Sequence, residues 1–169
     1  KVCLKELMSF EDVLSGFQTE GINGKISINE GLKKFFTFLD NNIAIHNIKE
    51  DKILFPLLHE RIMVNGEHSS VSGAETPKTA VDMLEDDHIK VMQSASVTFN
   101  LFGLASRLPD AKSRAITMHT AIEQGKSLIE LISLHIFRED NVVFPLAHKY
   151  ISNEEFDVME TKLSRYNNY

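Results

Sequence analysis

The sequence has a single cysteine, Cys3, among its 169 residues. One cysteine cannot form an intrachain disulfide, so an apolar core must hold the fold, which then tolerates a reducing compartment. With 43% apolar residues, a chain of this length can bury such a core as one ordinary domain. We therefore expect a single domain over residues 1–169 in a cytoplasmic setting. The sequence starts at Lys1, which fits a domain excised from a longer chain or one lacking the start of its first helix.

An excess of basic charge and long apolar runs are also missing. The formal net charge is -6, the isoelectric point is about 5.6, and the acidic residues are spread along the chain. No basic surface is therefore expected for a nucleic-acid backbone. No segment approaches the roughly 18 consecutive apolar residues of a membrane span, and the N-terminus lacks the apolar stretch of a signal peptide. We expect a soluble protein with no nucleic-acid or membrane partner.

Proline and glycine are scarce, with four and eight residues respectively. They leave long stretches of helical periodicity and almost no alternating pattern of the kind that strands require, which predicts an all-α chain. The apolar spacing predicts four long helices and a short fifth one. The long helices are expected at residues 1–17, from 28 to about 64, at 77–107 and at 110–150, and the short one after 152. Residues 65–76 form a polar connection between the second and third helices.

Local signals predict where these helices begin. Residues 27–30 and 152–155 each form a capping box, in which a serine and a glutamate satisfy free backbone donors at a helix start. Thr76 followed by Pro77 predicts a cap with proline in the first helical turn. Pro56 predicts a kink or a change of segment in the second helix.

The most informative pattern is a repeated block of fourteen residues. Residues 46–59 read HNIKEDKILFPLLH and residues 135–148 read HIFREDNVVFPLAH. In each block a glutamate follows the first histidine by four positions, which places the two side chains roughly 40° apart on one helix face. One such pair is usually a surface ion pair, but its repetition in the same context favours two matched halves of a metal site.

If the helices that carry the blocks lie side by side, His46, Glu50, His135 and Glu139 can point to a common centre. Burying two bare carboxylates is costly, and a pair of cations bridged by them offsets that cost. His88, from the third predicted helix, is a fifth candidate ligand. Imidazole and carboxylate together suit iron, manganese or zinc.

Other residues of the blocks have less certain roles. Asp51 and Asp140 follow the glutamates and are either partners of the ligands or surface charges, two readings of equal weight. His59 and His148 lie thirteen positions after the leading histidines, roughly 220° away on a continuous helix, so we expect them to point away from the site. The phenylalanines at helical spacing are expected to pack the core, with some lining a dry cavity beside the metals.

This pattern resembles the hemerythrin-like, or HHE cation-binding, family. The resemblance covers most of the chain and implies an up-and-down four-helix bundle with a short C-terminal fifth helix. It also implies a non-haem centre of two iron ions with an oxo or hydroxo bridge, manganese or zinc being less favoured. The ligands implied by the resemblance, with both glutamates bridging the metals, are His46, Glu50, His88, His135 and Glu139.

Two features depart from the family pattern. The first predicted helix contains no histidine, and its candidate substitutes are Cys3, Glu6 and Glu11. Oxygen-carrying hemerythrins place a second histidine four residues after the one on the third helix, whereas here Met92 follows His88 at that distance. Fewer histidines and more carboxylate favour a sensor or iron-responsive site over an oxygen carrier.

Three functions follow as hypotheses. The first is a binding and sensing module, whose di-iron centre senses iron, oxygen or nitric oxide and signals to a protein partner. The second is a di-iron enzyme of the type that repairs iron–sulfur centres under nitrosative or oxidative stress; such proteins carry an added cysteine-bearing region not found in this sequence. The third is a metal-free helical interaction domain. The sequence names no catalytic base or nucleophile, which favours a binding or sensor domain over an enzyme.

Overall fold

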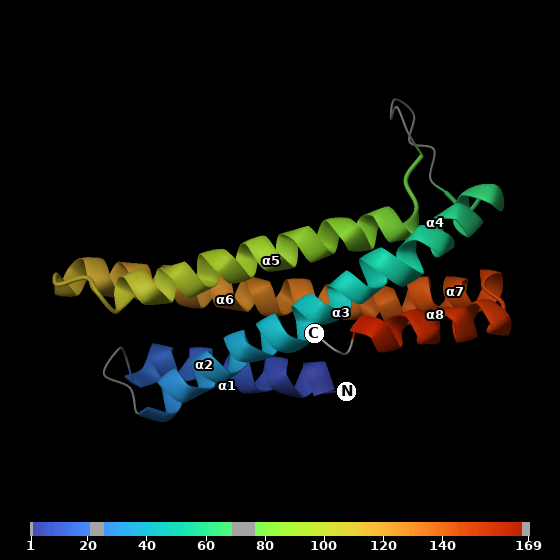
Figure 1. Ribbon diagram of the computed structural model, residues 1–169. Helices are drawn as coiled ribbons and strands as arrows, with labels where there is room; N and C mark the ends of the chain where they lie inside the picture. The colour runs from blue at the N-terminus through green and yellow to red at the C-terminus, as the bar shows by residue number, and fades with distance from the viewer. Residues whose placement is uncertain (1, 21–25, 69–76, 167–169) are drawn as a thin grey trace. The chain divides into compact units, whose positions relative to one another are not determined.

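The computed structural model describes residues 2–20, 26–68 and 77–166, with the side chains of residues 20, 26–28, 165 and 166 left out. Its α-helices and three π-helical turns follow one another along the chain (Figure 1). They are α1 (Val2–Glu20), α2 (Ile26–Phe38), η1 (Leu39–Ile43), α3 (Ala44–Lys49), η2 (Glu50–Leu54), α4 (Phe55–Val64), α5 (Ala80–Ala105), α6 (Ala111–Arg138), η3 (Glu139–Val143), α7 (Phe144–Tyr150) and α8 (Asn153–Tyr166).

These elements confirm the predicted all-α class. Across the described ranges the chain forms helices and no strand. The second predicted helix is the uninterrupted series from α2 to α4, and the fourth is the series from α6 to α7. With α1 and α5 they make four long helical stretches, and α8 is the expected short C-terminal helix. No helix in the described part of the chain is both long and apolar enough to cross a bilayer.

Capping side chains determine where α5 and α8 begin. At α8, the backbone N–H of Ser152 donates to Glu155 and that of Glu155 donates to the Ser152 hydroxyl, at 2.9 and 3.3 Å, so this capping box is confirmed. At α5 the start differs from the prediction, because Thr79 and Asp82 form the box instead. The helix therefore begins at Ala80, after Pro77, and the predicted cap at Thr76 lies outside the described residues. The side chain of Ser27, predicted to cap the second helix, is also outside them.

The interruption expected at Pro56 is a π-helical turn. In η2 the N–H of Phe55 bonds to the carbonyl of Glu50, five residues back instead of four. In η3 the N–H of Phe144 makes the same bond to Glu139. A proline cannot donate a backbone hydrogen bond, so an α-helical ladder is already broken at that point, and a widened turn accommodates the break. Both blocks thus change helix type at their glutamate.

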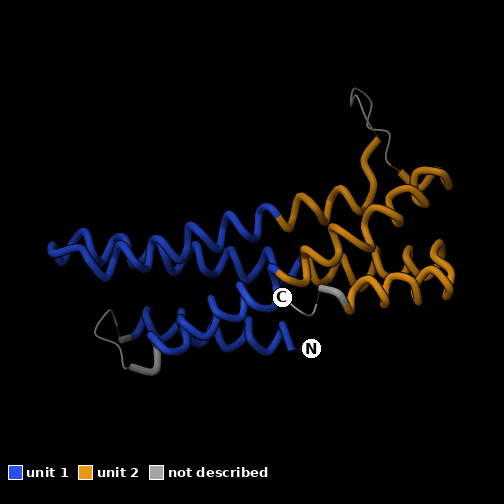
Figure 2. The backbone as a smooth tube through the Cα atoms, in the orientation of Figure 1, with its two compact units in different colours: residues 1–44, 89–134 blue, residues 45–88, 135–169 orange. Residues whose placement is uncertain are grey.

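The chain divides into two compact units (Figure 2). Unit 1 contains residues 1–44 and 89–134, and unit 2 contains residues 45–88 and 135–169. That one domain spans residues 1–169 stays a prediction. In unit 1, α1 packs on α2, and the ring of Phe10 stacks on that of Phe35 with centroids 3.7 Å apart. These phenylalanines pack the core, as expected.

Unit 2 has its own apolar core. It lies where α4 packs against α7, with the start of α5 and one face of α8 completing it. The buried side chains of this core are Phe55, Leu58, Ile62, Val81, Leu84, Val143, Ala147, Ile151 and Met159. Phe55 and Val143 belong to the repeated blocks, so the same segments supply both the core and the candidate ligands of this unit.

Candidate metal centre

All five candidate ligands lie in unit 2. His46 is on α3, and His88 is the ninth residue of α5; Glu50 is the first residue of η2. His135 is near the end of α6, and Glu139 is the first residue of η3. The backbone between the first histidine of each block and its glutamate is α-helical. The four-residue spacing therefore places these two side chains on one face of the helix.

Four of the five come together as a buried cluster. One ligand atom from each of Glu50, His88, His135 and Glu139 lies within 4.8 Å of the others. Nε2 of His88 is 3.4 Å from Oε2 of Glu50, and Nε2 of His135 is 3.1 Å from Oε1 of Glu139. The four side chains are between 4% and 6% exposed as residues, which is unusual for two carboxylates.

His46 stands at the open edge of this cluster. Its Nε2 is 3.1 Å from Oε1 of Glu139 and 3.4 Å from Oε2 of Glu50, so it touches the carboxylates of both blocks. Its side chain is 49% exposed, in contrast to the other four. The structure thus brings all five predicted residues together, with His46 as the member that faces solvent.

Several polar atoms of the cluster have no hydrogen-bond partner. They are both carboxylate oxygens of Glu50, Nε2 of His88 and both ring nitrogens of His135. The contacts of 3.1 to 3.4 Å between these imidazoles and carboxylates bring charges close without the direction that a hydrogen bond requires. Buried polar groups are nearly always satisfied. Converging, unsatisfied oxygen and nitrogen donors are what a cation site needs, so this donor set fits a metal.

The two carboxylates differ in their electrostatic environment. Burial raises the pKa of Glu50, and the neighbouring imidazoles offset only part of that rise. Burial also raises the pKa of Glu139, but contacts with His135 and His46 outweigh it and lower the pKa to about 2. The hydrogen bond to Glu139 raises the pKa of His46. The two buried carboxylates therefore lie in one cluster of closely spaced ionisable groups.

Asp51 supports His88 directly. Its Oδ1 lies 2.8 Å from Nδ1 of His88, so the imidazole donates its Nδ1–H to this carboxylate. The bond leaves the lone pair of Nε2 facing the cluster, as in ligand histidines held by a second carboxylate. Burial lowers the pKa of His88, yet the carboxylates of Glu50 and Asp51 raise it by more. Asp140, by contrast, is exposed, so the two block aspartates have different roles.

Two neighbours of the ligands were missed by the sequence reasoning. Asp87, which precedes His88, is 1% exposed and accepts a hydrogen bond from Arg138, which precedes Glu139. This pair ties α5 to the end of α6 beside the cluster. Opposite charges directly adjacent to two candidate ligands were the signal available in the sequence. The ring of Phe55 also stacks on His88, with centroids 5.5 Å apart.

The second histidine of each block and Glu6, a candidate substitute ligand, lie elsewhere. Nδ1 of His59 is 3.1 Å from the hydroxyl of Thr79, at the start of α5, and the His148 ring lies against Phe156. Glu6 pairs with Lys34 within unit 1. None of these residues is part of the cluster found among the described side chains.

Comparisons with known proteins place the chain in a cation-binding family. A family model described as the hemerythrin HHE cation binding domain matches residues 4–147. Among curated proteins, relatives named iron-sulfur cluster repair protein YtfE come from Escherichia coli O1:K1 / APEC, Escherichia coli strain SMS-3-5 / SECEC and Escherichia fergusonii. Each is 27% identical over 138 residues, covering 81% of this chain and 56% of the relative.

The chain therefore spans about half the length of the curated relatives it matches. No solved structure matches it significantly. The family model, in contrast, covers most of the chain, including all five candidate ligands. By that match the chain belongs to the hemerythrin HHE cation-binding family.

Proposed function

We propose that this domain binds two iron ions at the buried cluster of unit 2, with Glu50 and Glu139 bridging them. The observation that carries this proposal is the set of oxygen and nitrogen atoms on Glu50, His88 and His135 that could bind a metal and have no hydrogen-bond partner. A donor set of imidazole and carboxylate without thiolate is suited to non-haem iron. Four-helix proteins with di-iron sites use the same residue types on facing helices.

The residues around the cluster have separable roles. Asp51 holds the tautomer of His88, and the Phe55 ring covers that imidazole from one side. The half-exposed His46 marks the side from which a small ligand would approach. A bound iron pair would supply a redox-active, Lewis-acidic centre able to take up oxygen or nitric oxide. Metal binding to the folded form alone would also add stability to unit 2.

Two roles are compatible with such a site. As a sensor, the domain would change the conformational order of its helices, or its affinity for a protein partner, when iron, oxygen or nitric oxide binds. As part of a repair protein, it would act on damaged iron–sulfur centres. The names of the relatives favour the repair role. Because the chain matches only 56% of those proteins, their whole activity need not reside in this domain.

Elemental analysis of protein purified without chelator tests the metal proposal. We expect about two irons per chain for the unaltered protein. The double variant Glu50→Ala/Glu139→Ala should lose both, because it removes both shared carboxylates. His59→Ala is the matched control and should keep full iron content, since His59 contacts Thr79 instead of the cluster. Full iron in the double variant would overturn the bridging assignment.

A second experiment separates the two roles. Iron-loaded protein is mixed with a nitric-oxide-damaged iron–sulfur protein, and cluster recovery is followed by absorption. Recovery that depends on Glu50 and Glu139 supports the repair role. Uptake of nitric oxide or oxygen that changes amide hydrogen exchange in unit 2, without any recovery, supports the sensor role.

A further inference from the structure

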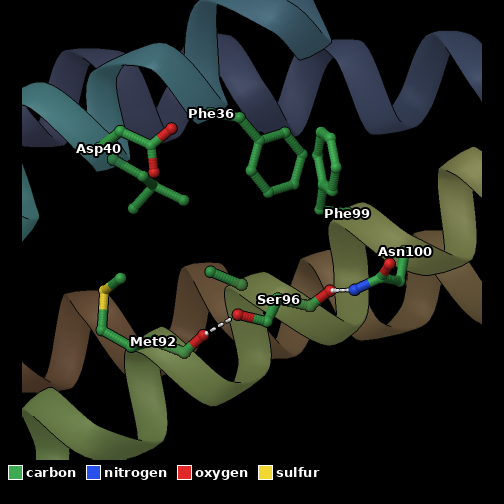
Figure 3. A pocket seen from close by; sticks show the side chains of 8 residues that line it. Phe36, Asp40, Met92, Ser96, Phe99 and Asn100 are labelled. Atoms are coloured by element: carbon green, nitrogen blue, oxygen red, sulfur yellow. Dashed lines mark hydrogen bonds between the residues drawn. The ribbon is translucent and has the colours of Figure 1, made fainter.

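We propose that a second site, a cavity in unit 1, binds a small organic cation of the alkylammonium type. The cavity lies between the end of α2 with η1 and the unit 1 part of α5 (Figure 3). Its volume is about 200 Å³, room for a molecule of several non-hydrogen atoms. It shares no residue with the metal cluster. Its lining residues are Phe36, Leu39, Asp40, Met92, Ala95, Ser96, Phe99 and Asn100.

Two aromatic rings form the middle of the cavity. Phe36 and Phe99 approach from opposite elements, with centroids 5.1 Å apart and planes at 75° (Figure 3). Phe36 is buried, whereas Phe99 is 59% exposed although it is fixed against another ring. Ring faces attract cations through their negative quadrupole. An exposed ring held in place at a cavity wall is an arrangement that a cationic ligand can use.

The polar groups of the cavity present acceptors. The hydroxyl of Ser96 donates to the carbonyl of Met92, and the amide of Asn100 donates to the carbonyl of Ser96, at 2.8 and 2.7 Å. The Ser96 hydroxyl proton and one N–H of Asn100 are thus engaged by the helix backbone, while the side-chain oxygens of both residues still have lone pairs. The thioether of Met92 adds a soft, polarisable surface.

Asp40 supplies the charge. It is exposed, lines the cavity on the element that faces Met92 (Figure 3), and makes no ion pair with any residue in the described ranges. No lysine, arginine or histidine is among the described residues that line the cavity. Ring faces, acceptor oxygens and one carboxylate together complement a positive charge on an apolar body. An anion would instead be repelled by the carboxylate of Asp40.

A pair of isosteric probes tests this inference on the full chain. Choline and 3,3-dimethylbutan-1-ol have nearly the same shape and differ in the charge of one central atom. Binding is followed by the NMR signal of the Met92 methyl group, with the methyl groups of other methionines as internal references. We expect choline to bind at least about tenfold more tightly than the neutral alcohol, and to weaken as salt is added. Equal affinities, or no shift at Met92, would overturn the inference.

Variants with matched controls localise the site. Asp40→Asn keeps the size of the side chain and should weaken choline binding about fivefold by removing the charge. Phe99→Leu should weaken it about three- to fivefold by removing a ring face. Phe137→Leu, a change at a ring that is 60% exposed outside the cavity, should have no effect. If Asp40→Asn binds choline as well as the unaltered protein, the assignment of the cavity is wrong. Should a variant not fold, the comparison of isosteres on the unaltered protein still decides.

Two further probes identify the source of the cation. Butylammonium represents free primary amines, and Nα-acetyl-lysinamide represents a lysine side chain of another protein. Binding of choline or butylammonium supports a free small cation as the ligand. Binding of Nα-acetyl-lysinamide with neither free cation would overturn that choice in favour of a protein partner.

Discussion

At the scale of single residues, the two aspartates of the repeated blocks show how the same residue at matched positions can have different roles. Asp51 accepts the Nδ1–H of His88, because α5 brings that imidazole alongside η2. Asp140 occupies the equivalent position in the second block and is exposed. A carboxylate bonded to a ligand histidine fixes the ring orientation and makes its other nitrogen a better donor. Asp51 alone has that geometry.

Under the proposed function, replacing Asp51 should therefore weaken metal binding. We expect Asp51→Ala to lower iron affinity by about 10- to 100-fold, the usual effect of losing such a supporting partner. Asp140→Ala, the matched change in the other block, should leave affinity within about twofold. Competition with a chelator of known affinity measures both. Equal losses in the two variants would mean that net charge, instead of the bond to His88, governs affinity.

These residues also show what spacing in the sequence can predict. His46 and Glu50, like His135 and Glu139, are linked by α-helical backbone, so a count of four residues was enough to place each pair on one face. The role of Asp51 depends on where the side chain of His88 lies, 37 residues further along the chain. Such a contact is set by packing between helices, and no local pattern encodes it.

At the scale of elements, the π-helical turns limit helix-based counting. The estimate that His59 lies roughly 220° from His46 assumed an uninterrupted α-helix. η2 lies between them, so the assumption does not hold, although His59 does contact Thr79 away from the cluster. Proline in the sequence indicated that the helix changes near Pro56, but the type of change follows from the hydrogen bond of Phe55 to Glu50. π turns recur at functional sites, and here η2 and η3 each start at a candidate ligand.

The contact between α1 and α2 gives a prediction about packing. A Cβ atom added at Gly31 would lie 2.4 Å from Cγ2 of Val13. Valine is stiff at χ1 and cannot easily rotate away. Gly31→Ala should therefore destabilise the fold by about 1–3 kcal/mol, although alanine is otherwise the better helix former.

A double-mutant cycle separates this clash from other effects of the change. Val13→Ala alone should cost stability by leaving space, but in combination Gly31→Ala/Val13→Ala should recover most of the loss caused by Gly31→Ala. Urea denaturation of the four proteins measures the free energies of unfolding. Strictly additive effects would show that the two residues are not in contact.

At the scale of the whole molecule, the proposed metal site would couple function to folding. Family membership and the helical class followed from the repeated blocks and from helical periodicity, since both are local patterns. The unpartnered donors of Glu50, His88 and His135 are a property of the folded chain alone. Leaving them buried without a metal costs free energy. The stability of the fold should therefore depend on whether a metal is bound, even far from the cluster.

This coupling predicts that one substitution has opposite effects with and without metal. Without metal, Glu50→Gln should unfold at the same temperature as the unaltered protein or higher, because it removes a buried negative charge whose oxygens have no hydrogen-bond partner. With free iron(II) at about a hundred times its dissociation constant, the unaltered protein should gain about 2.7 kcal/mol, a rise of about 5–10 °C in its unfolding temperature. Glu50→Gln should gain far less, because it lacks a bridging carboxylate. Calorimetry under anaerobic conditions, with chelator and with iron, measures all four unfolding temperatures. An unaltered protein that unfolds at the same temperature in both would show that the cluster does not hold a metal in the folded state, and that its buried carboxylates are stabilised by the imidazoles alone.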